Sequence, residues 1–298
     1  MTWYRDSVRR IQGRASVVVR RAVGLSGDPP TRCNDPREAY GDVHGVARIV
    51  HADLPSMLIG GLGSLFFQML HPYAMAGVAQ HSRYQDNPLG RLRQTADFIG
   101  ATTFGSQEAA RAAIERVLNV HRRVHGVADD GQPYDAYDPH LLRWVHCAEI
   151  YMFLNAYRRF GARRLSGADA DRYVAELAPL ASDLGVLSPP TSVAELDEAL
   201  LGYRGELRLC AEGVVARDFI AHGVMRGRGR RLVYWLFVRS AWSLLPPWAS
   251  DLLGVRSRPV GERLVIRPMT RLVSAAFHLA VPPPPQVISV SPPSSATT

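Results

Sequence analysis

Signals that begin helices recur along this chain, whereas the alternation of apolar and polar residues that a half-buried strand needs is almost absent. Twice, a side chain that can cap a helix is followed directly by proline, which fits the first helical turn because no amide hydrogen is needed there. A third start carries a capping box, a serine followed three residues later by a glutamate. These starts are Asn87-Pro88, Asp138-Pro139 and Ser192 with Glu195. The pattern predicts an all-α protein.

The expected helices form a single-domain multi-helix bundle without an internal repeat. We expect a basic N-terminal extension over residues 1–35, a helical domain over residues 36–280 and a disordered Pro/Ser tail over residues 281–298. Pro72 is expected to kink the chain or to restart a helix. The other predicted helices cover residues 36–53, 55–70, 88–103, 106–126, 139–161, 192–212, 229–245 and 259–279.

The basic side chains are all arginine, which excludes several kinds of chemistry. Without lysine the chain has no residue for a Schiff base, a P-loop or a Ser-Lys dyad. The net charge of +8 arises at the two ends of the chain, and the long middle is acidic overall. This distribution lacks the continuous basic patch of a nucleic-acid-binding domain, so we expect no nucleic-acid partner.

The spacing of the cysteines and the length of the apolar segments bear on where in the cell the protein is found. Three widely separated cysteines form neither a closed disulfide set nor a CxxC pair, so we expect a reducing, cytoplasmic location. The most apolar window, residues 57–70, is shorter than the roughly 20 residues that span a bilayer, and we interpret it as a core helix. The basic run over residues 1–21 is either a solvated extension or an amphipathic helix that contacts a membrane surface or a partner. A homo-oligomer is compatible with the sequence.

One histidine occupies a core position of a predicted helix. The apolar stripe of the helix expected from Ser106 runs Ala110, Ile114, Val117, His121 and Val124, with spacings of 4, 3, 4 and 3 residues. A neutral imidazole on such a face needs a carbonyl, a carboxylate or a metal as its partner. His121 is therefore a core histidine with a protein partner or a metal ligand. His125, four residues on, would share its face and offers a second ligand for a non-haem metal site.

A polar pair stands in the helix expected from Pro88. Arg91 and Thr95 are four residues apart, so a guanidinium and a hydroxyl share one face. The pair is either a surface salt bridge beside a helix-facing threonine or part of a site that stabilises negative charge.

Taken in order, several motifs resemble the MpaB-like oxygenase family, which includes the latex-clearing rubber oxygenases. The resemblance covers roughly residues 40–255, and the ordered set is more specific than any of its members. Gln94 stands where the rubber oxygenases have a lysine, which distinguishes this chain from them. The motifs are Gly60-Gly61-Leu62-Gly63, Gln68-Met69-Leu70-His71-Pro72, Asn87-Pro88-Leu89-Gly90-Arg91, Val120-His121-Arg122-Arg123-Val124-His125-Gly126, Tyr134-Asp135-Ala136-Tyr137-Asp138-Pro139, Leu142-Arg143-Trp144-Val145-His146 and Leu245-Pro246-Pro247-Trp248.

The resemblance implies an all-helical protein with a buried pocket for one haem b. Its iron would take a single axial ligand, which the family motif places at His121. Arg91 and Thr95 would lie beside the open face of the haem, where they stabilise charge on bound oxygen. His71 and His146 are candidates for contacts to the haem or its propionates. Gly61, in its Gly-rich segment, would let a backbone approach the macrocycle, and close helix packing is the alternative.

The implied function is a haem b-dependent oxygenase that acts with dioxygen or peroxide on an apolar, prenyl-like or other alkene substrate. Three alternatives remain open from the sequence. The protein is a haem sensor or carrier without turnover, a non-haem metalloenzyme that uses His121 and His125, or a helical interaction protein in which these histidines are structural.

Overall fold

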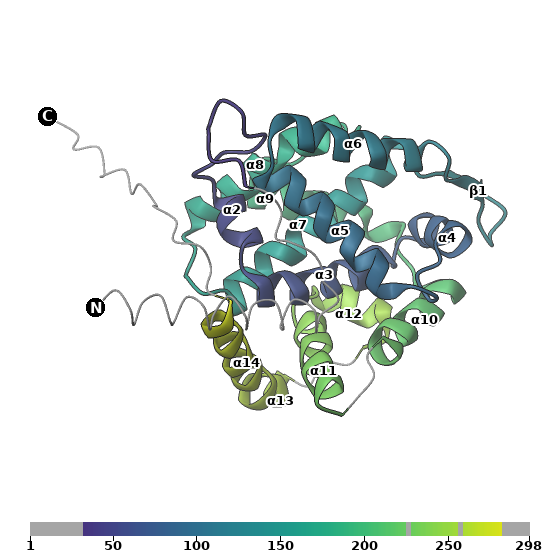
Figure 1. The fold of residues 1–298 in the computed structure, drawn as a ribbon. Coiled ribbons are helices and arrows are strands. Elements are labelled where there is room, and N and C mark those ends of the chain that lie inside the picture. Colours follow the sequence, from purple (N-terminus) through teal and green to yellow (C-terminus); the bar gives the residue numbers. More distant parts are fainter. Residues whose placement is uncertain (1–31, 225–227, 256–258, 282–298) are drawn as a thin grey trace, which may run out of the picture.

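The computed structural model describes residues 32–224, 228–255 and 259–281 (Figure 1). The expected N-terminal extension up to residue 31 and the tail from residue 282 lie outside the described residues. Helices dominate the fold, as the sequence predicts. They are α2 (Val46–His51), α3 (Leu54–Gln68), α4 (Pro72–His81), α5 (Pro88–Phe104), α6 (Gln107–His121), α7 (Pro139–Phe160), α8 (Gly167–Asp183), α9 (Val193–Gly202), α10 (Ala211–Asp218), α11 (Arg228–Trp242), α12 (Pro247–Leu253), α13 (Pro259–Gly261) and α14 (Arg267–Ala280).

Helices α3 and α7 form the centre of the fold and pack along each other. Helix α3 begins at a cap in which the Asp53 carboxylate accepts from the Ser56 amide at 3.0 Å. Glycine makes the close approach possible. A Cβ at Gly60 would lie 2.7 Å from Cδ1 of Phe153, and one at Gly63 would lie closer still to the end of Met152. The core therefore depends on the absence of side chains at these two positions.

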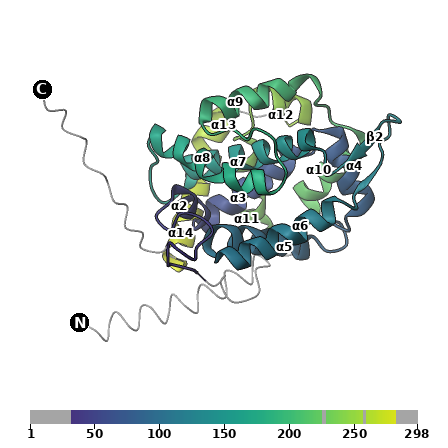
Figure 2. The ribbon, with the colours of Figure 1, turned by 90° about the horizontal axis from the view of Figure 1, so that it is seen from above.

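The remaining helices surround this central pair. Figure 2 shows the α5–α6 hairpin on one side of the pair and α8 with α9 on the other. Helices α11 and α14 also pack against α3, and α10 packs against α4. The α5–α6 hairpin is held mainly by its own two helices and by α2. The α5–α6 hairpin thus forms a layer of its own beside the central pair of helices.

Three expected helix boundaries were wrong, and one helix was not predicted. Helix α2 is shorter than the expected helix over residues 36–53 because Asp35 accepts from the Arg37 amide at 2.9 Å and holds a turn there. The helix expected to reach Gly126 ends at His121. The helix expected over residues 192–212 ends at Gly202 and is followed by a 3₁₀ turn and a separate α10. Helix α8 was missed, although Ser166 and Asp169 form its capping box.

A short hairpin follows α6 where the sequence predicts helix. Strand β1 (His125–Val127) pairs antiparallel with β2 (Pro133–Asp135), and Gly126 lies opposite Tyr134. Tyr134 is buried, and its hydroxyl donates to Oε1 of Gln80 at 2.7 Å. The turn contains Gly131 at a φ of 79°, a conformation that glycine adopts without strain. Burial of a single tyrosine thus overrides the helical pattern of residues 122–126.

No single helix in the described residues is both long enough and apolar enough to cross a bilayer. Helices α3 and α4 together reach that length and composition, but a bend of 106° separates them.

Replacing the packed glycine should cost stability, and replacing its neighbour should not. A Cβ at Gly60 would meet the backbone Cα of Phe153 at 3.0 Å as well as its ring, so we expect Gly60→Ala to destabilise the protein by about 1–3 kcal/mol. A Cβ at Gly61 would have its nearest neighbour at 3.8 Å, and Gly61→Ala should gain up to about 1 kcal/mol from helix propensity. Urea unfolding followed by circular dichroism measures both. Equal effects of the two changes would contradict the packing described.

Candidate functional site

The α5–α6 hairpin brings together two residues that lie thirty positions apart. Arg91 stands in the first turn of α5, and His121 is the last residue of α6. The two helices pack antiparallel, so the start of one meets the end of the other. The Arg91 guanidinium is close enough to act on His121 electrostatically and, after burial, is the second cause that lowers the pKa of that imidazole. Both effects favour the neutral form of the His121 imidazole.

His121 is partly buried and has a nitrogen without a protein partner. Its Nδ1 is inaccessible to solvent and accepts or donates no hydrogen bond to a described residue. An unsatisfied buried nitrogen of this kind costs about 1–3 kcal/mol, and such groups concentrate at functional sites. The sequence predicts that His121 needs a partner on its buried side. No described residue supplies one to its Nδ1.

Arg91 and Thr95, which the resemblance places beside the open face of the haem, make different contacts. Nη1 of Arg91 donates to Oγ of Ser82 at 3.3 Å, which orients the guanidinium. The Thr95 hydroxyl donates to the carbonyl of Arg91 at 3.2 Å, within its own helix. Both side chains are exposed. Arg91 is the member of the pair that lies near His121, whereas the Thr95 hydroxyl bonds to its own helix.

Helix α7 contributes two half-buried titratable groups. His146 and Glu149 are three residues apart and share a face of the helix. Desolvation, with Arg143 nearby, lowers the pKa of His146 to about 4, and its Nε2 is buried without a hydrogen-bond partner. Desolvation raises the pKa of Glu149 to about 7. The sequence did not single out Glu149, although it is the lone carboxylate of a largely apolar helix.

Gly61 is next to Gly60 on α3 but is packed less tightly. A Cβ at Gly61 would have Cε1 of Phe153, on α7, as its nearest neighbour at 3.8 Å, which is an ordinary contact. Leu58 and Leu62 of the same helix are half-buried, and Leu65 is 45% exposed. The alternative of close helix packing describes Gly60 and Gly63, whereas Gly61 has room for a side chain.

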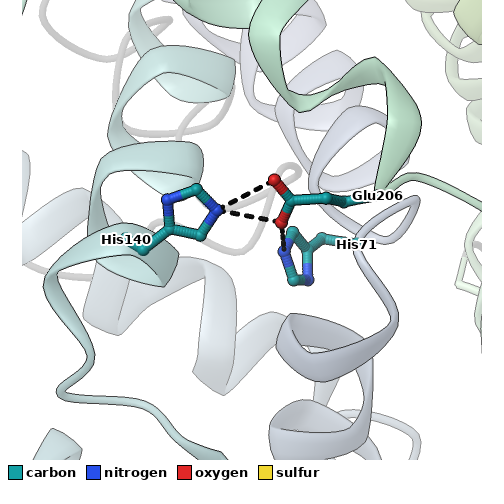
Figure 3. Close-up of side chains that lie close together, drawn as sticks. All are labelled: His71, His140 and Glu206. Carbon is teal, nitrogen blue, oxygen red and sulfur yellow. Dashed lines mark hydrogen bonds and ion pairs between the residues drawn. The ribbon is translucent and has the colours of Figure 1, made fainter.

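His71 lies in another part of the fold, beside two residues that the sequence analysis did not select. His140 and Glu206 converge on it, as Figure 3 shows. The Nε2 of His140 lies 2.9 Å from Oε2 of Glu206, and the Nε2 of His71 lies 3.6 Å from the same oxygen. Desolvation by burial lowers the pKa of His71 to about 4. The three residues line a groove of about 660 Å³.

His125 lines this groove as well and does not share a helix face with His121. The expectation of two ligands one helical turn apart was wrong, because α6 ends at His121 and His125 belongs to strand β1. The chain thus separates the two histidines of one motif into two environments.

Sequence comparison identifies the family. The catalytic domain described as "ER-bound oxygenase mpaB/B'/Rubber oxygenase" matches residues 48–275, and the chain belongs to this family. Uncharacterized proteins of Mycobacterium bovis and Mycobacterium tuberculosis are each 32% identical to the chain over 112 residues. The alignment spans 36% of this chain and less than half, 43%, of each of these curated relatives. No solved structure matches the chain. Membership of the family supports an oxygenase role.

The half-buried carboxyl of Glu149 on α7 should make stability depend on pH in a defined direction. The pKa of Glu149 rises on folding from 4.5 to about 7, so the native state binds more protons than the unfolded state between these values. Stability from this group is present below pH 4.5 and is lost as the pH rises through 7. We expect Glu149→Gln to be more stable than the wild type by about 1–3 kcal/mol at pH 8 and by much less at pH 4.5.

Urea unfolding at the two pH values measures this difference. His146 contributes equally to the pH dependence of stability in the wild type and in Glu149→Gln, so its contribution cancels from the difference between them. Glu198→Gln on α9 removes an exposed carboxylate and controls for the loss of one charge. If Glu149→Gln gained the same stability at both pH values, the pKa of Glu149 would not be raised on folding.

Proposed function

We propose that this chain is a haem b-dependent oxygenase whose iron is held by His121. The observation that carries the proposal is the buried, unpartnered Nδ1 of His121, on an imidazole whose pKa is lowered by burial and by Arg91. A neutral imidazole without a protein partner has the donor chemistry that a haem iron needs. Family membership supports the oxygenase class.

A flat apolar cofactor needs apolar surface beside its ligand, and α3 offers such surface elsewhere in the fold. Leu58, Leu62 and Leu65 are incompletely covered there, and Gly61 carries no side chain. Arg91 would pair with the negative charge of a propionate or of an oxygen ligand. His146, with its unpartnered Nε2, is a further candidate for hydrogen bonding to the cofactor.

Bound haem would supply an open coordination position for dioxygen or peroxide and the oxidising chemistry that acts on an alkene. The chain's own residues supply the surroundings. The guanidinium of Arg91 is held by Ser82 and carries a fixed positive charge for an anionic oxygen. Glu149, with a pKa near 7, can hold a proton at neutral pH and release it, which is the requirement for a general acid. The partly exposed leucines of α3 favour an apolar substrate.

The cytoplasmic location, the apolar partner and a homo-oligomeric state remain predictions, as does contact of residues 1–21 with a membrane surface.

Removal of the proposed iron ligand should remove the haem. The full chain, purified from haem-supplemented cells, should show a Soret band that shifts on dithionite reduction and again with carbon monoxide. His121→Ala should lower the haem content per chain at least about tenfold, because the imidazole is the protein's bond to iron. His125→Ala is the matched control and should retain most of the haem. A Soret band of full intensity in His121→Ala assigns the ligand elsewhere, and a folded wild type without a Soret band overturns the proposed function.

Arg91 and Thr95 should differ in their effect on an anion at the iron. We expect Arg91→Ala to keep its haem and to bind fluoride at the ferric iron about 10- to 100-fold more weakly, as the loss of a charged hydrogen bond implies. Thr95→Val should change fluoride binding less than about twofold, because the hydroxyl is engaged by its own helix. Optical titration of the ferric protein gives both constants. A larger effect at Thr95 than at Arg91 would reverse the assigned roles.

A further inference from the structure

We propose that His71, His140 and Glu206 form a binding site for a divalent transition-metal ion, best matched to Zn²⁺. The site is separate from the proposed haem site and does not rest on it. Two imidazoles and one carboxylate are a donor set that such ions take, with a further position left open. Each of the three side chains offers one ligand atom, and these three atoms lie within 4.8 Å of one another.

A buried histidine without a hydrogen-bond partner forms the floor of the site. His71 is only 2% exposed, and neither of its ring nitrogens makes a hydrogen bond to a described residue. Its Nε2 is aimed at Glu206 but stops 3.6 Å from Oε2, too far for a hydrogen bond. A core histidine with a purely structural role would have a partner for at least one nitrogen. An ion between His71 and Glu206 supplies that partner.

The distances from Glu206 to the two histidines suit a tetrahedral ion. Bonds of about 2.0–2.2 Å from Zn²⁺ hold their ligand atoms about 3.3–3.6 Å apart. The distance of 3.6 Å from His71 to Glu206 fits without movement. The distance of 2.9 Å from His140 to Glu206 must open by about half an ångström to reach the same range. Both of these side chains are about half exposed, so this adjustment disturbs no core packing.

The backbone around the three ligands is tied together, so the site is built in advance. His71 precedes Pro72 at the bend between α3 and α4, and proline restricts its backbone to the extended region. The Tyr203 hydroxyl donates to the carbonyl of His140 at 2.8 Å. The Arg208 amide donates to the carbonyl of Leu70 at 2.8 Å and ties the segment after Glu206 to the residue before His71. Three distant segments are thereby fixed at one point.

Aromatic rings pack against His71 on the buried side of the site, and the side that opens to the groove is polar. Trp144 and Tyr203 lie against His71 with ring centroids 6.2 and 6.5 Å away. The groove above includes Asp135 and Asp138, whose carboxylates add to the negative charge that attracts a cation. Because all three ligands line this groove, the fourth position of the ion is left for water or for a small ligand.

Metal titration of the full chain tests the proposal. After treatment with EDTA, calorimetric titration with Zn²⁺ should give one saturable site per chain, and Co²⁺ should give the visible absorption of a tetrahedral complex. We expect His140→Ala and Glu206→Gln to weaken Zn²⁺ binding at least about 100-fold. Both replacements are at exposed side chains, so they keep the fold. Their haem content should equal that of the wild type, which separates this test from that of the proposed function.

Two histidine variants serve as matched controls. His125→Ala removes an imidazole from the same groove, and His44→Ala removes an exposed one elsewhere. Both should bind Zn²⁺ within about twofold of the wild type if the three ligands are the ones assigned. The proposal is overturned if the wild type shows no saturable site, if the His140 and Glu206 variants bind as well as the wild type, or if either control abolishes binding.

Discussion

The contact between α3 and α7 sets the positions of the other elements, because α7 carries residues of both candidate sites and α3 leads directly into His71. Two glycines of α3 admit the side chains of Met152 and Phe153. That contact fixes the rotation of both helices. It turns His146 and Glu149 to one face of α7. A change in this packing would therefore alter the surroundings of titratable groups that make no contact with the glycines themselves.

The two candidate sites differ in their physical basis. The first rests on polar groups whose pKa values are displaced by desolvation, His121 at the end of α6 and His146 with Glu149 on α7. Displaced pKa values of this kind are typical of catalytic and cofactor sites. The second is defined by convergence, since three ligands from distant segments meet at one groove. The first suits a large cofactor with few polar atoms, and the second suits a small cation.

The sequence predicted the helices whose starts carry their own capping chemistry, including α5 and α7, because these signals act over three or four residues. It also selected His121, since helical spacing reveals a polar residue on an apolar stripe, and Arg91, through its spacing from Thr95 and the family resemblance. It failed where a distant contact decides the outcome. Tyr134 converts the end of a predicted helix into a strand. Glu206 and His140 meet His71 only because the folded chain brings three segments together, and no local pattern encodes that meeting.

The short connection between α6 and β1 has a consequence for how the two sites communicate. Only three residues separate His121 at the end of α6 from His125 in the wall of the groove. A ligand that repositions the end of this helix therefore also moves the wall of the groove. Any free energy transmitted in this way is reciprocal: a ligand in the groove changes the affinity of the His121 site by the same factor by which a ligand at His121 changes that of the groove.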